Sequence, residues 1–226
     1  MSISLVLFDL DGTLTDSAPG ITRSVAYALE KMGAEPLPPE KLLRFIGPPL
    51  KQSFRRYCGF DEARCEEAVR CYREYFTAGG MFENAVYPGV PEALEELRSA
   101  GLRLAVATSK PELYSRQITG RFGLTAYFEG VFGAAMDETR TDKAEVVQYA
   151  LASLGASPAQ ALMVGDREHD VLGAKQAGLP CVGVLWGYGS REELTKAGAE
   201  ALAETPEALA ELIEALRTSG PHFSAK

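Results

Sequence analysis

The sequence predicts an α/β protein, a doubly wound parallel sheet with helices on both faces and a small helical domain inserted after the first strand. Three observations lead to this prediction. Short apolar runs alternate with segments of helical periodicity over residues 90–216, which is typical of parallel α/β sheets. Every strong pattern in residues 17–82 is helical or broken by proline. Reactive residues follow most of the apolar runs, as expected where parallel strands end at one rim.

The first strand is predicted at residues 5–8, where four apolar residues in a row indicate burial on both faces of a sheet. Helical spacing then begins at Ile21 and stops at Gly33, a residue that commonly ends helices. Further helices are expected at 41–46, 50–57 and 62–76. We therefore assign residues 17–82 to a helical insert, and residues 1–16 and 83–226 to the core that contains the sheet.

The core continues with strands predicted at 102–107, 131–133, 161–164 and 181–185. Helices are predicted between and after them, at 90–99, 112–122, 143–154, 170–177 and 206–216. A chain of 226 residues suits one domain, or one domain with a smaller insert.

The net charge of −8 argues against a nucleic-acid polymer as partner, because basic patches supply most of that affinity. A small phosphorylated metabolite stays possible, since one pocket can be positive on a negative protein. The apolar run before Asp9 is too short to cross a membrane and has no basic leader, so a cytoplasmic location without membrane contact is expected. Either a monomer or a homodimer fits. The four cysteines form no Cys-x-x-Cys pair, which disfavours zinc or a disulfide framework.

Asp9 and Asp11 stand two residues apart at the end of the first strand. In the functional interpretation Asp9 attacks phosphorus and becomes a transient acyl phosphate, while Asp11 exchanges protons with the leaving oxygen and the attacking water. Gly12 would let the backbone approach the phosphate closely. The alternative is a solvated Asp-Gly turn, which is a common structure.

Thr108 and Ser109 follow the second predicted strand and precede Lys110-Pro111, a pattern that indicates a helix start and a phosphate cradle. Simple helix capping uses the same geometry and stays open. Lys143 is expected in the first turn of a helix, where its charge opposes the helix dipole. A phosphate and a carboxylate would offset that charge, and so would solvent with Asp142 or Glu145 nearby.

Asp166 and Asp170 stand four apart at a predicted helix start. Two like charges at this spacing repel each other mildly, and a hard cation would offset them. Mg²⁺ prefers a few carboxylates together with water and substrate phosphate. The alternative is an ordinary acidic helix N-terminus. The order of acid pair, hydroxyl, lysine and acid pair, each after a strand or at a helix start, favours phosphoryl transfer.

These stretches resemble the four signature motifs of haloacid dehalogenase-type phosphatases: Phe-Asp-Leu-Asp-Gly-Thr-Leu from residue 8, Thr108-Ser109, Lys143 and Gly-Asp-Arg-Glu-His-Asp from residue 165. The resemblance covers nearly the whole chain. It implies a Rossmann-like core with Asp9 as nucleophile, Asp11 as acid and base, and Thr108 and Lys143 on the phosphate. It also implies Mg²⁺ held by Asp9, the Asp11 carbonyl and Asp166, with Asp170 reaching the ion directly or through water. The dehalogenase branch lacks an acid at position 11, so halide removal is disfavoured.

The insert resembles the helical cap of the branch that contains phosphoglycolate phosphatases, with Phe-Ile-Gly-Pro-Pro-Leu from residue 45 as its cap loop. Ser109 stands where asparagine is usual in that branch. The combined motifs look closest to 5′-nucleotidase-like bacterial enzymes. A nucleoside 5′-monophosphate is therefore the leading expected substrate, and 2-phosphoglycolate the second.

The expected contacts with the leaving group or the phosphate come from the core and from the insert: Gly12, Ser109, Lys110, Arg23, Arg44 and Lys51. For the charged residues of the insert, a solvated helix face is the alternative. Two other functions stay open at this stage. A sugar phosphomutase would share Asp9 and Asp11, and a catalytically silent binding protein could use the same fold.

Overall fold

The computed structural model describes residues 3–137 and 139–219. It divides into two compact units. One unit comprises the described residues up to Leu14 and from Val86 onward, and the other comprises Thr15–Ala85. The predicted insert, residues 17–82, lies inside the second unit.

The core unit is built on one parallel sheet, in which every neighbouring pair of strands runs in the same direction. The strand order is β5-β4-β1-β6-β7-β8. The bounds are β1 (Leu5–Phe8), β4 (Arg103–Pro111), β5 (Val131–Ala134), β6 (Ala161–Gly165), β7 (Cys181–Val184) and β8 (Ala201–Ala203). Because β1 pairs with β4 on one side and β6 on the other, all four of its side chains are buried. The predicted fold class is confirmed.

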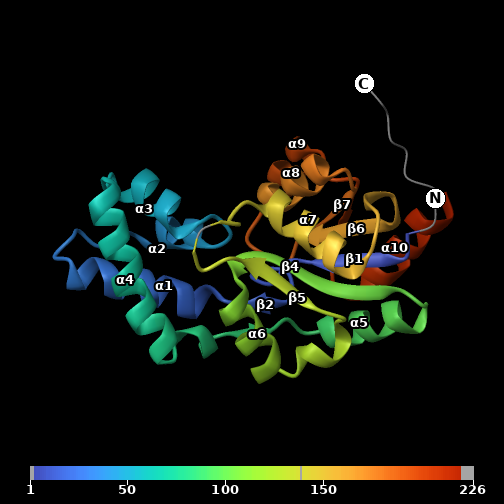
Figure 1. The fold of residues 1–226 in the computed structure, drawn as a ribbon, viewed down its shortest axis with the longest axis horizontal. Coiled ribbons are helices and arrows are strands. Elements are labelled where there is room, and N and C mark those ends of the chain that lie inside the picture. The colour runs from blue at the N-terminus through green and yellow to red at the C-terminus, as the bar shows by residue number, and fades with distance from the viewer. Residues whose placement is uncertain (1–2, 138, 220–226) are drawn as a thin grey trace. The chain divides into compact units, whose positions relative to one another are not determined.

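Helices cover both faces of this sheet (Figure 1). They are α5 (Val90–Ser99), α6 (Glu112–Arg121), α7 (Lys143–Leu154), α8 (Glu168–Ala177), α9 (Arg191–Ala197) and α10 (Glu207–Ser219), with the 3-10 turns η3 (Leu124–Tyr127) and η4 (Pro158–Gln160). Val147 of α7 and Val171 of α8 belong to the same buried cluster as Leu5 and Leu7 of β1. Val6, which lies between Leu5 and Leu7 in β1, is buried as well. Helix α5 packs against α10.

The carboxyl ends of β1, β4 and β6 form the rim on which the predicted site residues lie. Asp9 directly follows β1, and its N–H donates to the carbonyl of Val164 in β6 at 2.9 Å. The sheet pairing therefore continues up to the first predicted catalytic residue and fixes its backbone.

The helix predicted at 112–122 begins where expected, but the strand before it is longer than predicted, and the helix predicted at 170–177 begins two residues earlier. Strand β4 runs on through Thr108 and Ser109 to Pro111, so α6 begins only at Glu112. The residue before a proline is pushed toward extended backbone, which explains the longer strand. Helix α8 begins at Glu168, so Asp166 precedes the helix and does not form an i,i+4 pair with Asp170.

Two elements of the core were not predicted, α9 and β8. Helix α9 begins after Ser190, whose hydroxyl accepts the N–H of Glu193 at 3.1 Å. A serine followed three residues later by a glutamate is the capping-box pattern, and this signal could have located α9. Strand β8 has three residues, which is too short for a periodic signal.

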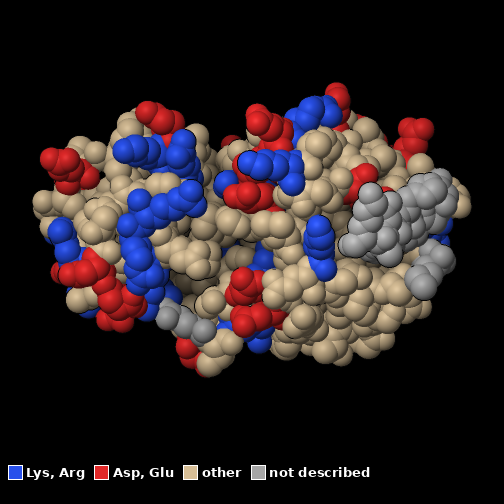
Figure 2. All heavy atoms as spheres, turned by 90° about the horizontal axis from the view of Figure 1, so that it is seen from above, with Lys and Arg blue, Asp and Glu red and all other residues tan. Residues whose placement is uncertain are grey.

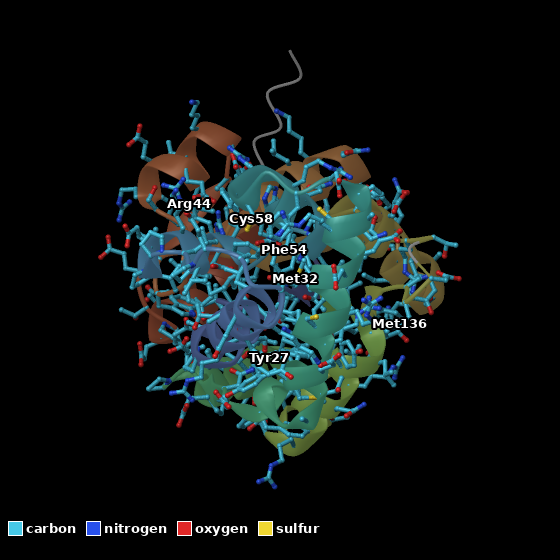
Figure 3. The ribbon with its side chains drawn as sticks, turned by 90° about the vertical axis from the view of Figure 1, so that its left-hand side faces the viewer. Tyr27, Met32, Arg44, Phe54, Cys58 and Met136 are labelled. Carbon is cyan, nitrogen blue, oxygen red and sulfur yellow. The ribbon has the colours of Figure 1, made fainter. Side chains whose placement is uncertain are left out.

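The second unit contains α1 (Ala18–Lys31), α2 (Pro39–Leu42), η1 (Leu43–Phe45), α3 (Leu50–Cys58), α4 (Glu62–Ala78) and η2 (Gly80–Phe82). Both α1 and α3 pack against α4. The centroid of the Phe54 ring lies 5.0 Å from that of Phe45, which it meets edge-on, and 6.1 Å from that of Phe60, on which it stacks, so aromatic packing holds α3. Phe54 is labelled in Figure 3. Strands β2 (Thr15–Asp16) and β3 (Ala85–Val86) pair with each other where the insert begins and ends.

No helix within residues 3–137 and 139–219 has both the length and the apolar character that a membrane crossing requires.

Candidate active site

Three buried carboxylates meet at the rim of the core sheet. Asp9 follows β1, Asp166 follows β6 and Asp170 lies in the first turn of α8. One oxygen from each lies within 4.8 Å of the others. Burial, with the added repulsion of Asp170 and Asp9, raises the pKa of Asp166 well above its ordinary value. Without a cation, this cluster is electrostatically unfavourable in its charged form.

Lys143 is the ammonium group of the cluster. Its Nζ lies 2.7 Å from Asp9 Oδ1 and 2.7 Å from Asp170 Oδ1, and it donates to the carbonyl of Ala107 at 3.1 Å. Burial alone would lower the pKa of Lys143, but Asp170 and Asp9 outweigh it and raise that pKa above its ordinary value. For Asp170, burial outweighs the ammonium of Lys143, so its pKa is raised.

The local sequence explains why Lys143 points into the core. Asp142 caps α7 by accepting the N–H of Ala144 at 2.9 Å, and Glu145 accepts the N–H of Asp142 at 3.2 Å. These two carboxylates therefore serve the capping box, and Lys143 pairs with the acid cluster rather than with them. On α8, Gly173 leaves the space: a Cβ there would lie 2.6 Å from Cγ of Lys143.

Asp166 is held by groups from the loops after β1 and β7. Its Oδ2 accepts the N–H of Tyr188 at 2.8 Å, and its Oδ1 accepts the hydroxyl of Thr13 at 3.3 Å. The indole of Trp186 donates to the carbonyl of Thr13 at 2.9 Å and joins these two loops. The sequence analysis assigned no role to Thr13 or Trp186, and a backbone N–H such as that of Tyr188 leaves no side-chain signal.

Gly12 and Gly187 lie against the Asp166 carboxylate. A Cβ on either residue would overlap its Oδ2, and Gly12 also has a left-handed backbone with φ +86°. The sequence analysis expected Gly12 to let the backbone approach a phosphate. The structure adds that Gly12 makes room for Asp166.

Helix α9 supports the start of α8 through Glu193. One oxygen of Glu193 accepts from Nε of Arg167 at 2.8 Å and from the N–H of Glu168 at 2.9 Å. The N–H of Arg167 in turn donates to Asp170 Oδ2 at 3.0 Å. Glu193 thus fixes the segment that carries Asp166 and Asp170, a role that sequence reasoning missed.

Asp11 makes a separate buried ion pair. Its Oδ2 lies 2.6 Å from Nζ of Lys110, and the two side chains are 9% and 6% exposed. Lys110 was expected to contact substrate, whereas here it pairs with Asp11. Thr108 is buried and its hydroxyl accepts the N–H of Lys110 at 3.3 Å, while Ser109 is half-buried beside them.

The charged residues of the insert that were predicted to contact substrate are exposed or pair with acids of the second unit. Arg44 is exposed on η1. Lys51 lies 3.5 Å from Glu62 and 3.6 Å from Glu66 of α4, and Arg23 lies 2.6 Å from Glu83. These ion pairs agree with a solvated helix face. The substrate-binding role of Arg44 and Lys51 stays a prediction.

The acid cluster fits a hard divalent cation. Its donors are carboxylate oxygens, which Mg²⁺ prefers. Three carboxylates and the ammonium of Lys143 leave two negative charges in a buried place, which a divalent cation would offset. The carboxylate of Asp11 is not part of the group, so Asp11 as a ligand would use its backbone carbonyl.

Comparison with known proteins agrees with this fold. The model of the family described as haloacid dehalogenase-like hydrolase matches residues 6–184. The chain is 49% identical over 189 residues to a 5′-nucleotidase of Pseudomonas aeruginosa, covering 84% of this chain and 86% of that protein. It is 45% identical over 196 residues to the tyrosine-protein kinase PtkA of Mycobacterium tuberculosis, covering 86% of this chain and 66% of that protein.

It is also 33% identical over 184 residues to a phosphoglycolate phosphatase of Aquifex aeolicus, covering 81% of this chain and 85% of that protein. A crystal structure described as a "predicted phosphatase" from Clostridium acetobutylicum has a TM-score of 0.92 and 46% identity, covering 96% of this chain and all of that one.

The chain belongs to the haloacid dehalogenase-like hydrolase family. Within that family it is an enzyme of the phosphatase type, as the sequence predicts.

Proposed function

We propose that this chain is a Mg²⁺-dependent phosphate monoester hydrolase that forms an aspartyl phosphate on Asp9, with a nucleoside 5′-monophosphate as its leading substrate. The observation that carries the proposal is the buried contact of Asp9 with Lys143, beside Asp166 and Asp170. It supports a nucleophilic carboxylate held in one orientation next to positive charge.

In the first step an oxygen of the Asp9 carboxylate attacks phosphorus. The bond from phosphorus to the leaving oxygen breaks, its electron pair goes to that oxygen, and the carboxylic acid of Asp11 supplies the proton. Lys143 holds Asp9 and offsets negative charge on the phosphoryl group, while the buried hydroxyl of Thr108 is the candidate donor to a phosphoryl oxygen.

In the second step the Asp11 carboxylate takes a proton from water. The water oxygen bonds to phosphorus, the bond between phosphorus and Asp9 breaks, and inorganic phosphate leaves with Asp9 again ionised. Asp9, Asp166, Asp170 and the Asp11 carbonyl would hold Mg²⁺, which when bound neutralises charge on the phosphate.

The relative named 5′-nucleotidase supports the leading substrate class. The exposed Lys41, Arg44 and Arg56 of the insert add support, while Lys51 and Arg55 pair with Glu62 of α4. Figure 2 shows Lys and Arg side chains grouped on the exposed surface of the insert. Such a surface favours an anionic substrate. 2-Phosphoglycolate is the second candidate, supported by the relative named for that activity.

A substrate panel tests the proposal. Purified protein is assayed for phosphate release from nucleoside 5′-monophosphates, 2-phosphoglycolate and hexose phosphates, with Mg²⁺ and with the metal chelated. We expect release that needs Mg²⁺ and is most efficient for nucleotides. A preference for phosphoglycolate would reverse the substrate order, and no phosphate release from any of these esters would refute the hydrolysis.

The Asp9→Asn variant is the chemical control. It should fold, as judged by its melting temperature, and lose at least about 10³-fold in kcat/KM, because an amide cannot replace the nucleophile. Mass spectrometry of acid-quenched wild type should detect one added phosphoryl group, absent from the variant. A phosphomutase would instead depend on a bisphosphate and release little free phosphate. Hydrolysis that proceeds unchanged in the variant would contradict the mechanism.

A further inference from the structure

The two carboxylate oxygens of Asp11 differ in their partners. Oδ2 is occupied by the ammonium of Lys110 at 2.6 Å. Oδ1 is buried and has no hydrogen-bond partner among the described residues. A buried polar atom left unpaired costs about 1–3 kcal/mol, so such atoms tend to mark functional positions.

The chain fixes Lys110 from several sides. Its N–H donates to the hydroxyl of Thr108 at 3.3 Å, and its carbonyl accepts from the hydroxyl of Ser115 at 3.5 Å. Because Lys110 is itself nearly buried, its ammonium has few orientations that retain the contact with Asp11. A carboxylate paired through one oxygen to a fixed cation cannot rotate easily, so its second oxygen keeps one direction.

We propose that Lys110 is the positioning residue for acid–base catalysis: it binds Oδ2 of Asp11 and thereby presents Oδ1 to the leaving-group oxygen and then to water. This inference rests on the proposed hydrolysis. It assigns the proton transfer to one named oxygen, and it replaces the role of substrate contact that the sequence predicted for Lys110. In the first step the proton passes from Oδ1 to the leaving oxygen, and in the second step Oδ1 receives a proton from water.

Leaving groups of different basicity test this role. Nitrophenolate leaves without needing a proton, whereas an alkoxide leaves only with help from a general acid. In Lys110→Met, kcat/KM should therefore fall about 10²-fold for glycerol phosphate and a nucleoside 5′-monophosphate. For p-nitrophenyl phosphate it should fall less than about 10-fold. KM should change little, because Lys110 would not bind the substrate.

Matched variants give the controls. Lys175→Met makes the same change at an exposed position of α8 and should alter none of these values. Asp11→Asn should show the same dependence on the leaving group as Lys110→Met, and the double variant should lose little more than Asp11→Asn alone. Lys110→Arg retains a cation and should recover part of the lost rate. An equal loss for all substrates, or a loss confined to KM, would overturn the proposal and return Lys110 to substrate binding.

A double-mutant cycle on the melting temperature tests the ion pair between Lys110 and Asp11 independently of catalysis. The melting temperature of the Lys110→Met, Asp11→Asn double variant should lie above the value that adds the two single losses, because each single change leaves one buried group unpaired. Additive losses would overturn the ion pair and the inference with it. A coupled pair in a protein that hydrolyses no phosphate ester would instead overturn the proposed function and this catalytic role together.

Discussion

Replacing Lys143 with methionine removes the ammonium of the acid cluster and keeps an unbranched side chain of similar length. Lys143 is 5% exposed and contacts Asp9 and Asp170 at 2.7 Å each. Breaking a buried ion pair by removing one partner costs about 3–5 kcal/mol. For a chain of 226 residues each kcal/mol shifts the melting temperature by about 2–4 °C. We therefore expect the metal-free variant to melt roughly 6–20 °C below wild type.

Differential scanning calorimetry in EDTA and in Mg²⁺ measures this effect. The variant carries three buried carboxylates without their cation, so Mg²⁺ should raise its melting temperature more than that of wild type. Its kcat/KM should fall by about 10²–10³-fold, because Asp9 loses the group that orients it and offsets phosphoryl charge.

Lys175→Met, on the exposed face of α8, is the matched control and should change stability by less than about 0.5 kcal/mol. A metal-free Lys143→Met protein that melts within about 2 °C of wild type would refute the electrostatic account of the cluster.

Two further predictions concern the same region. Since the pKa of Asp166 is raised, its ionised form destabilises the metal-free fold at neutral pH, and this cost disappears as pH falls toward its ordinary value of 3.8. Asp166→Asn should thus be more stable than wild type in EDTA at pH 7, and the difference should shrink at lower pH. A difference in chemical denaturation that stays constant with pH would contradict this. Glu193→Gln should weaken Mg²⁺ binding about 10–100-fold. The affinity is measured from the rise of the melting temperature with Mg²⁺ concentration, and Glu192→Gln at the exposed neighbouring position is the control. Equal Mg²⁺ affinities for Glu193→Gln and wild type would refute the supporting role of Glu193.

The strands of the core were predictable because a parallel sheet is buried on both faces, so that β1, β6 and β7 consist of continuous apolar runs. The same topology explains why Asp9, Lys143 and Asp170 could be expected at one rim before any coordinates were known. β4 was predicted too short, because its last residues leave the core and are polar. Ser109 and Lys110 carry no apolar signal although their backbone stays extended.

The supporting contacts were not predictable, because they depend on packing between residues far apart in the sequence. Lys110 and Asp11 are separated by 99 positions, and neither residue type indicates the other as partner. Tyr188 contributes a backbone N–H, which every residue except proline possesses. Gly173 could be interpreted only once the side chain of Lys143 was seen beside it.

The pairing of β2 with β3 makes the helical unit a module that can be exchanged. The two strands bring the ends of that unit together, and just outside them the N–H of Tyr87 donates to the carbonyl of Leu14 at 3.2 Å. A segment whose ends are already neighbours can change in length at a small entropic cost, since each doubling of a loop adds only about 0.6 kcal/mol. Evolution or a protein engineer could therefore exchange the helical unit at this junction, while the core sheet and the residues at its rim stay as they are.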